Sequence, residues 1–491
     1  MSREVSPARI AAYEVLRRVE EDAAYLSILL SNLPTDLRVE DRALCHEISL
    51  GSVRWQLWLD KVIQKFSGRF AESLDRCVRI ALRIGLYQIR FLSKIPHSAA
   101  VNESVNLVHG QRFGAASGFV NAVLRRACRE IKYDPAAEIA DPIERLSVKY
   151  SHPDRLVRRW IEKFGIAETE KFIKANNENA PVSFRICPDF DAATDISREE
   201  QIFDELRQAG VDVVPSCLVS GAWRLKVGKV GKGGATLNNL ANKGLVYIQD
   251  EASQLAAALV APVEGDRIID VCAAPGSKAT QIAANTPRGT LPQGTLPQGT
   301  LIVAGDRSEA RLRTMKKSME LQKIKWIQIV CYDAERELPF AQSTFDKVLV
   351  DARCSGTGTL RRNPEIRWRI NLSDIKELSA HQKRVISNAA QLVAPDGQLL
   401  YSTCSVEREE AEEVIEDFLC HHPDFELFVS PAQLKKIEKL PRAMKDEFRN
   451  SAMIRTWPHR DDTDGFFIAS LRRRASAREP EKIHHGGTAD H

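Results

Sequence analysis

The sequence predicts an α/β protein in which a domain built on a mostly parallel β-sheet follows an all-α domain. Up to about residue 140, apolar residues recur every three to four positions, as in "CVRIALRIGLYQIRFL", and this spacing is typical of amphipathic helices. From about residue 244, short apolar runs such as "DRIIDVC", "LIVAGD" and "GQLLYSTC" alternate with helical segments. That alternation requires crossover connections, and therefore a parallel sheet covered by helices on both faces.

These patterns divide the chain into four parts. Residues 1–140 are expected to form the all-α domain, because turn residues in "SGRF", "KIPHS" and "RFGAAS" separate its helices. Residues 141–243 are expected to form linker helices and a small α/β subdomain, with short strands at "VSFRI" and "VDVVPS". The sheet domain then occupies residues 244–474, and residues 475–491 form a tail that we expect to be disordered.

A five-residue repeat interrupts the sheet domain. "GTLPQGTLPQGTL" begins at Gly289, between the first helix and the second strand of that domain. It is interpreted either as a flexible surface insertion or as a lid that contacts substrate. The repeat contains no aromatic and no charged residue, which favours the insertion.

Length and composition exclude several classes of protein. A chain of 491 residues exceeds the size of one hydrophobic core, and 43% apolar with 28% charged residues is typical of globular proteins. No apolar stretch reaches membrane-spanning length, and the N-terminus lacks a secretory signal. We therefore expect a cytoplasmic protein without membrane contact. We also expect this protein to be a monomer. The ten cysteines are scattered, none paired at the spacing of zinc ligands, so no metal site is expected.

Four acidic residues end successive predicted strands. Asp270, Asp306, Asp333 and Asp351 each close an apolar run, and open parallel sheets bind ligands at the carboxyl ends of their strands. Read singly, Asp333 and Asp351 are better explained as solvated or capping acids. The loop "DVCAAPGSKAT" adds a sharp turn and a helix N-terminus that can meet a carboxylate or phosphate, and Asp306 is placed to bind a ribose diol. Together these features indicate a site for an adenosine-containing cofactor.

Two cysteines stand at adjoining strand ends beside these acids. A single thiol there is usually a packing residue, but Cys354 follows "VLVD" and Cys404 ends "GQLLYSTC". The chemistry that needs two thiols is alkylation of carbon 5 of a pyrimidine, which becomes nucleophilic only after a thiolate adds to carbon 6. Asp351 could hydrogen-bond the ring nitrogen and the exocyclic amine, and a second cysteine or its neighbours could remove the carbon 5 proton.

The residues carry a resemblance to a known family. The blocks "DVCAAPGSKAT", "AGDRSEARL", "FDKVLVDARCSGTGTLRRNPEIRW", "YSTCSVEREEAEEVI" and "DGFFIASL" resemble the RsmB/Nop family of RNA cytosine-carbon-5 methyltransferases, which use S-adenosylmethionine on a Rossmann-like fold. "RALCHEISLGSVRW" and "GFVNAVLRR" resemble the NusB-like RNA-binding helical domain. This pairing implies the bacterial RsmB subgroup, which methylates small-subunit (16S) ribosomal RNA.

The resemblance implies a role for each site residue. Cys404 matches the family nucleophile and Cys354 the second cysteine, which helps to release the product. Asp306 matches the acid that binds the cofactor ribose, Asp333 the residue near adenine, and Asp351 the acid between cofactor and base. The methionine-binding loop is matched by Cys272, Ala273, Ala274, Pro275, Gly276, Ser277 and Lys278.

Three residues differ from the usual family pattern. Arg353 stands where proline is usual, Ser277 where a second glycine is usual, and Ala411 where asparagine is common. A proline would fix the backbone φ, so Arg353 is expected to change the shape of the base pocket, or to meet an RNA phosphate. A glycine tolerates positive φ, so a serine would be strained if position 277 required it.

A basic and aromatic segment follows Cys354, and two functions compete with the leading one. We expect RNA contacts, rather than a solvated loop with a core tryptophan, from Arg361, Arg362, Arg367, Trp368 and Arg369. One alternative is the same chemistry on transfer RNA or another RNA. The other is a non-catalytic RNA-binding assembly factor, against which the intact Cys404, Cys354 and Asp351 argue.

Overall fold

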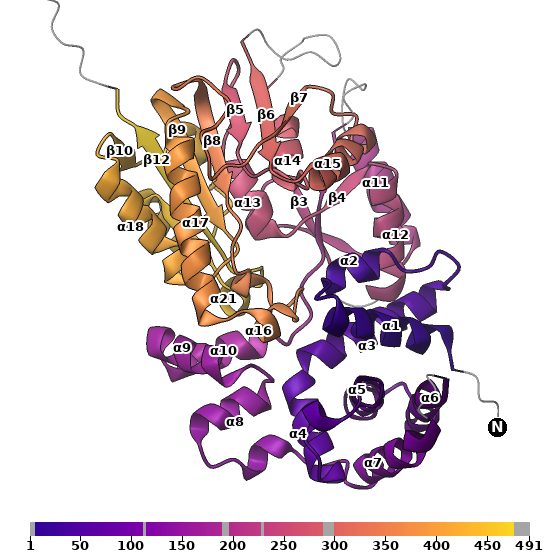
Figure 1. Cartoon of the computed structure of the whole chain (residues 1–491). Coiled ribbons are helices and arrows are strands. Elements are labelled where there is room, and N and C mark those ends of the chain that lie inside the picture. Colours follow the sequence, from indigo (N-terminus) through magenta and orange to yellow (C-terminus); the bar gives the residue numbers. More distant parts are fainter. Residues whose placement is uncertain (1–4, 111–113, 189–195, 227–229, 288–298, 476–491) are drawn as a thin grey trace, which may run out of the picture.

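The computed structural model describes residues 5–110, 114–188, 196–226, 230–287 and 299–475 (Figure 1). The predicted disordered tail, apart from its first residue, and most of the "GTLPQ" repeat lie outside the described residues. Within those ranges, none of the helices combines the length and apolar character that a membrane span needs.

The N-terminal part of the chain is entirely helical, as predicted. Helix α5 lies at its centre and is buried over nearly its whole length, with Val78, Ile84 and Leu86 in the core, because apolar residues occupy most of its circumference. Arg83 on the same helix is also buried and pairs with Asp60 at 2.7 Å. The helices of this domain are α1 (Pro7–Glu21), α2 (Leu26–Ser31), α3 (Val39–Arg54), α4 (Gln56–Ser67), α5 (Arg76–Phe91), α6 (His97–Gly110) and α7 (Ser117–Arg129).

Three linker helices and a small antiparallel sheet follow. The helices are α8 (Pro142–Lys149), α9 (Asp154–Phe164) and α10 (Ile166–Ala175). The sheet has the order β2-β3-β1-β4 and carries α11 (Ile196–Gln208) and α12 (Val230–Asn242); its strands are β1 (Ser183–Ile186), β2 (Val213–Pro215), β3 (Ala222–Leu225) and β4 (Val246–Ile248). Strand β4 pairs with β1, so this small sheet extends beyond the expected boundary at residue 244.

The C-terminal part is built on an eight-stranded sheet. Strands β9, β8, β5, β6 and β7 are parallel neighbours in that order, β12 pairs antiparallel with β9, and β10 and β11 both pair with β12. The strands are β5 (Arg267–Asp270), β6 (Leu301–Asp306), β7 (Ile327–Cys331), β8 (Phe345–Asp351), β9 (Val393–Thr403), β10 (Phe425–Leu427), β11 (Met453–Thr456) and β12 (Phe466–Arg473). The prediction of a mostly parallel, Rossmann-like sheet is confirmed.

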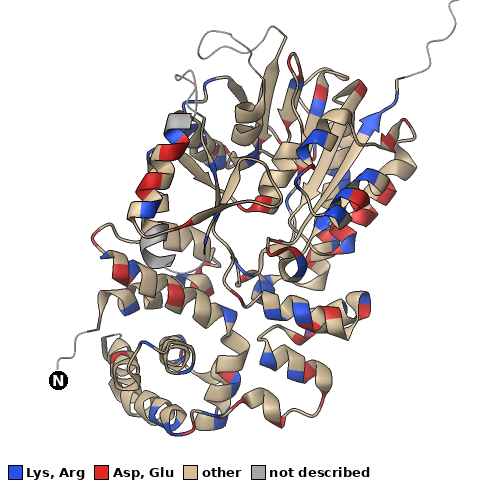
Figure 2. Ribbon diagram, turned by 180° about the vertical axis from the view of Figure 1, so that it is seen from behind, with Lys and Arg blue, Asp and Glu red and all other residues tan. Residues whose placement is uncertain are grey.

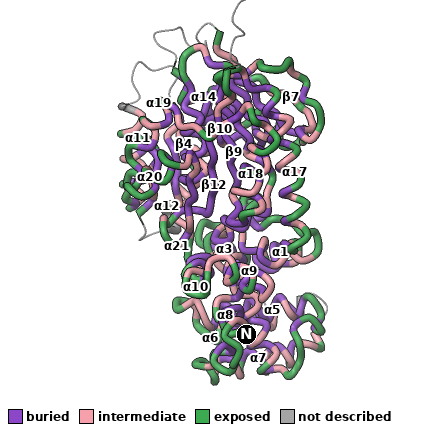
Figure 3. The backbone as a smooth tube through the Cα atoms, turned by 90° about the vertical axis from the view of Figure 1, so that its left-hand side faces the viewer, coloured by how far each residue is buried: buried purple, intermediate pink, exposed green. Residues whose placement is uncertain are grey.

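Helices cover both faces of this sheet, and the buried residues concentrate in the sheet and against it (Figure 3). Alternate strand residues face opposite ways, so Ile268 packs in one core cluster and Ile269 in the other. The first cluster contains residues of α13 (Glu251–Leu259), α14 (Ser277–Asn285), α15 (Glu309–Leu321) and α20 (Arg442–Ser451), and the second residues of α17 (Leu372–Ala390) and α18 (Glu412–His421). The remaining helices are α16 (Ile366–Arg369), α19 (Pro431–Lys436) and α21 (Pro458–Asp461).

Helix α16 joins the sheet domain to the N-terminal helices and the linker helices (Figure 1). The guanidinium of Arg367 is fully buried and donates to Asn177 Oδ1 at 2.9 Å and to the Ser151 carbonyl at 3.1 Å. Trp368 Nε1 donates to the Val53 carbonyl at 2.8 Å. These bonds stabilise the contact between three parts of the chain that are distant in sequence.

The arginines of this segment have partners within the protein, and contact with RNA stays a prediction. Arg361 is 2% exposed and pairs with Asp462, Arg362 pairs with two buried aspartates, and Arg369 donates to carbonyls at the end of α1 and the turn after it. Each of these arginines thus binds a carboxylate or a carbonyl within the protein. Elsewhere, Figure 2 shows lysine and arginine interspersed with aspartate and glutamate along the helices.

Candidate active site

The four predicted acids meet at one edge of the large sheet. Asp270, Asp306 and Asp351 are the last residues of β5, β6 and β8, and Asp333 follows β7 by two positions. Because β8, β5, β6 and β7 are parallel neighbours, their carboxyl ends lie side by side. The strand order therefore brings together four residues that span 81 positions of sequence, from 270 to 351.

The loop after β5 has the backbone that its sequence requires. Gly276 has a φ of +103°, and a Cβ there would lie 2.6 Å from Met315 Cγ, so glycine is needed for both conformation and space. Ser277 is the first residue of α14 and does not have a positive φ, so a serine fits there without strain. The Ala273 amide donates to the Gly305 carbonyl at 2.7 Å and fixes the loop against β6.

The residues of this edge fit an adenosine-containing cofactor. Both carboxylate oxygens of Asp270 are buried, and burial together with the Asp351 charge raises the pKa of Asp270 to about 7. Asp306 accepts from the Ser308 amide at 2.9 Å and pairs with Arg311 at 3.0 Å. The N-terminus of α14 supplies free amides beside the loop.

The neighbouring thiol of Cys272 lies close to the same acids. It is half-buried, and burial and the charges of Asp270 and Asp351 raise its pKa far above the value of a free thiol.

The two predicted cysteines are in direct contact. Cys354 Sγ lies 3.1 Å from Cys404 Sγ, and both side chains are half-buried. Cys404 directly follows β9 and Cys354 follows β8 by three residues; the two strands are parallel neighbours. A Cβ on Gly358 would lie 1.9 Å from the Gly465 carbonyl oxygen, and this close approach lets the Gly358 amide donate to the Cys404 carbonyl at 3.0 Å.

The surroundings of Cys404 favour its protonated form. The contact with Cys354, burial, and the negative charge of Asp351 raise the pKa of Cys404 well above the value of a free thiol, and the Lys278 ammonium opposes the rise. In this state Cys404 is a thiol at neutral pH. Reaction as a thiolate therefore requires loss of a proton when substrate enters.

An ion pair lies next to the thiols. Lys278 Nζ donates to Asp351 Oδ2 at 2.6 Å, and Ser402 Oγ donates to Asp351 Oδ1 at 2.7 Å, so both oxygens of this carboxylate are fixed. Burial alone would lower the pKa of Lys278, but the charges of Asp351 and Asp270 raise it overall. The sequence analysis assigned Lys278 only to the cofactor loop and did not predict that it lies close to Asp351 and the two cysteines.

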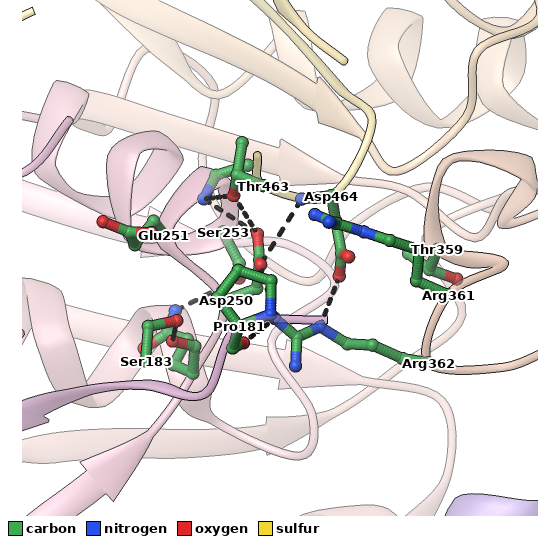
Figure 4. A network of polar contacts seen from close by, with 12 residues as sticks. Pro181, Ser183, Asp250, Glu251, Ser253, Thr359, Arg361, Arg362, Thr463 and Asp464 are labelled. Carbon is green, nitrogen blue, oxygen red and sulfur yellow. Dashed lines mark hydrogen bonds and ion pairs between the residues drawn. The ribbon is translucent and has the colours of Figure 1, made fainter. Parts of the chain in front are cut away.

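A cavity of about 220 Å³ joins these groups. Its lining includes both cysteines, Asp351 and Lys278, together with Asp250, Ser253, Ala352, Thr359, Asp464 and Phe466. Arg362 stabilises two of the acids in this lining: its guanidinium binds Asp250 at 2.8 Å, Asp464 at 2.9 Å and the Pro181 carbonyl at 2.8 Å (Figure 4). Sequence reasoning missed Asp250 and Asp464; the only signal was the acid before the glycine in "DGFF".

Two departures from the family pattern have a structural account. Arg353 is exposed beside Cys354, and its carbonyl accepts from Gln382 Nε2 at 2.9 Å, so the backbone at this position is fixed without a proline. Ala411 is fully buried in the core that α17 and α18 form with the sheet, where an apolar residue fits. Among the described residues, no group of three or more His, Cys, Asp or Glu side chains is arranged to hold a metal ion.

Comparison with known proteins identifies the family. Residues 257–472 match the model of the 16S rRNA methyltransferase RsmB/F family, and residues 6–129 match that of the NusB family. The probable ribosomal RNA small subunit methyltransferase B of Bacillus subtilis is 30% identical over 95% of this chain and 98% of its own. Ribosomal RNA small subunit methyltransferase B of Vibrio cholerae is 31% identical over 87% of this chain and 92% of its own.

Solved structures agree with the sequence comparison. The crystal structure of PH0851 has a TM-score of 0.73 and 28% identity, covering 96% of this chain and 99% of that one. A methyltransferase homolog from Pyrococcus horikoshii is 24% identical, and the match covers 68% of this chain and 100% of that one. It shares the fold with a TM-score of 0.51. The resemblance drawn from the sequence is thus confirmed, and the chain belongs to the RsmB/F family of 16S rRNA methyltransferases.

Proposed function

We propose that this chain methylates carbon 5 of a cytosine in small-subunit ribosomal RNA, with S-adenosylmethionine as donor and a covalent Cys404 adduct as intermediate. The observation that carries the proposal is the pair of thiols 3.1 Å apart at adjoining strand ends, beside the Asp351–Lys278 ion pair. The family supports the substrate class, since the named relatives are small-subunit rRNA methyltransferases.

The cofactor residues follow the strand order. Asp306 would bind the ribose hydroxyls, Asp333 the adenine, and the loop from Cys272 to Lys278 the methionine part. When bound, S-adenosylmethionine supplies an electrophilic methyl group on a sulfonium. The buried Asp270 carboxylate, with a pKa of about 7, would be stabilised by a cationic or hydrogen-bond-donating group brought to this edge.

The nucleophilic step belongs to Cys404. Its thiol gives its proton to solvent and the thiolate sulfur forms a bond to carbon 6, so electron density moves onto carbon 5 and ring nitrogen 3. Asp351 accepts a hydrogen bond from the exocyclic amine, and the Lys278 ammonium offsets the charge that develops at the ring. The pair therefore stabilises the adduct rather than the free base.

Release requires a second group near the same carbon atoms. After carbon 5 accepts the methyl group, its proton must leave before the carbon–sulfur bond at carbon 6 breaks. Cys354 Sγ is close enough to Cys404 to act on the same ring. We propose that Cys354, in its thiolate form, accepts this proton and so frees the enzyme from the methylated base.

The base must leave its stack to reach the cavity. Carbon 6 is inaccessible within a helix, and flipping a nucleotide costs a few kcal/mol. The cavity of about 220 Å³ is lined by both thiols and also by Phe466 and Thr359. A monomeric enzyme in the cytoplasm, where ribosomes assemble, remains our prediction.

The test is a methyl-transfer assay with radiolabelled S-adenosylmethionine on unmodified small-subunit rRNA and, separately, on transfer RNA. The proposal expects label at carbon 5 of one cytosine of the ribosomal RNA, and none with Cys404→Ala. Label on transfer RNA alone would favour the alternative substrate. Absence of label on either RNA at high enzyme concentration would favour a non-catalytic RNA-binding factor.

A further inference from the structure

A fully buried carboxylate lies behind the two cysteines. Glu410, in the short 3-10 helix η5 (Arg408–Glu410), is 0% exposed, although glutamate is rarely buried without compensation. The carboxylate accepts hydrogen bonds from the Ser355 amide at 2.8 Å, Gln382 Nε2 at 3.0 Å, Ser405 Oγ at 2.6 Å and the Ser355 hydroxyl. Four donors thus converge on one side chain.

The donors come from the residues that directly follow the two thiols. Ser355 follows Cys354 and Ser405 follows Cys404, and their hydroxyl oxygens lie 3.1 Å apart. Glu410 therefore links the segment after β8 to the segment after β9. Its contacts lie one residue beyond each of the two cysteines. The distance between the two sulfur atoms depends on how these two strand ends are held.

Further contacts extend the link on both sides. Gln382 Nε2 also donates to the carbonyl of Arg353, the residue before Cys354. Tyr401, three residues before Cys404, donates its hydroxyl to the backbone carbonyl of Glu410 at 2.7 Å. Thr357 Oγ1 lies 3.2 Å from Ser405 Oγ and accepts from the Val406 amide. Glu410 is the centre of this network, because both cysteine segments reach its side chain directly.

We propose that Glu410 is a positioning residue, which holds Cys354 and Cys404 at the separation that attack and release require. The inference rests on the proposed function and deepens it. The two thiols must act in sequence on neighbouring atoms of one base, so their separation matters as well as their presence. A displacement of about 1 Å at a reacting group can cost about a hundredfold in rate.

The sequence offers a matched control for a purely stabilising role. Glu407 is also 0% exposed and lies three residues earlier, but its carboxylate binds Arg159 at 2.6 Å and Trp160 Nε1 at 2.9 Å, in the linker helix α9. Glu407→Ala therefore removes a buried carboxylate of the same segment without removing a contact to either cysteine segment. A role for Glu410 in folding alone predicts the same outcome for both alanine variants.

A conservative variant separates shape from charge. One oxygen of Glu410 accepts from an amide and from Gln382, and the other faces two hydroxyl groups, which can accept as well as donate. Glu410→Gln can therefore keep all four contacts, with its carbonyl oxygen on the first pair and its amide nitrogen on the second. Glu410→Ala loses all four.

The direct test measures the thiol pair without RNA. Phenylarsine oxide forms two arsenic–sulfur bonds with a close pair of thiols and releases one water. We expect tight binding in the wild type, loss of binding in Cys354→Ala and Cys404→Ala, and near wild-type binding in Glu410→Gln and Glu407→Ala. Glu410→Ala should bind at least about tenfold more weakly, because the second bond loses its effective concentration.

Methyl transfer supplies the second measurement. Glu410→Ala should lower kcat about a hundredfold with little change in the KM for RNA, and Glu410→Gln should restore it. Wild-type arsenical binding by Glu410→Ala would overturn the inference, and so would equal losses in Glu410→Ala and Glu407→Ala. If Glu410→Ala does not fold, the double variant Ser355→Ala with Ser405→Ala replaces it, with the same two outcomes. Arsenical binding does not depend on methyl transfer, so failure of the proposed function is seen separately.

Discussion

Replacing Arg362 by methionine should destabilise the sheet domain, because one guanidinium stabilises two buried carboxylates on the cavity wall. The side chains of Asp250 and Asp464 are 10% and 5% exposed, and each lies within 2.9 Å of the guanidinium. Breaking a buried ion pair by removing one partner costs about 3–5 kcal/mol. Asp250 keeps the Thr463 hydroxyl and the Ala252 amide, both at 2.9 Å, so we expect the lower end, about 3 kcal/mol.

The assay is thermal unfolding followed by circular dichroism. For a domain of 150–250 residues, each kcal/mol lowers the Tm by about 2–4 °C, so Arg362→Met should lower it by roughly 6–12 °C. The matched control is Arg474→Met, which removes an exposed ion pair with Glu426 and should change stability by less than about 1 kcal/mol.

The loss of stability in Arg362→Met should depend on pH, with a definite sign. Burial raises the pKa of Asp464 to about 6, against the opposing charge of Arg362. A carboxyl group with a raised pKa binds more protons when folded, so its contribution to stability falls as pH rises through that pKa. Without Arg362 the pKa rises further, and the deficit of Arg362→Met should be smaller near pH 5 than near pH 8. Adding Asp464→Asn should recover much of the loss; an unchanged Tm in Arg362→Met, or no recovery, would refute the reasoning.

Three further predictions concern catalysis and domain contact. The contact with Cys354 and burial raise the pKa of Cys404. The single-turnover rate of methyl transfer, measured by rapid quench, should therefore rise roughly tenfold per pH unit between about pH 7 and 9. A plateau of that rate below pH 8 would contradict this prediction. Lys278→Met should lower the same rate about a hundredfold, with folding checked by circular dichroism. Arg367→Met should speed hydrogen exchange in α16 and at the end of α3 but not at the end of β9, as mass spectrometry can show.

The position of the site could be predicted because strand ends are readable in the sequence. Asp270, Asp306 and Asp351 each close an apolar run, and a parallel sheet must bring such residues to one edge. The same logic placed Cys354 and Cys404 on adjoining strands. Strand ends alone do not predict the 3.1 Å contact between the two sulfur atoms, because that contact depends on the Glu410 network and on the close approach of Gly358.

The basic segment after Cys354 could not be interpreted from its composition. Arginine and tryptophan serve RNA contact and domain contact equally well, and only the fold shows that Arg367 and Trp368 reach carbonyls of the helical domains. Likewise, Arg362 binds residues 112 and 102 positions away, a distance that no local pattern reports. Pairing of β4 with β1 is also long-range, which explains why the small sheet extends beyond its expected boundary.

Covalent trapping tests the central claim most directly. Cys354→Ala, incubated with unmodified small-subunit rRNA and S-adenosylmethionine, should accumulate a protein–RNA complex that survives denaturing electrophoresis, because Cys404 still attacks carbon 6 and the group that completes release is gone. The complex should vanish in the double variant that also carries Cys404→Ala. Normal turnover by Cys354→Ala without such a complex, or a complex that persists without Cys404, would contradict the account.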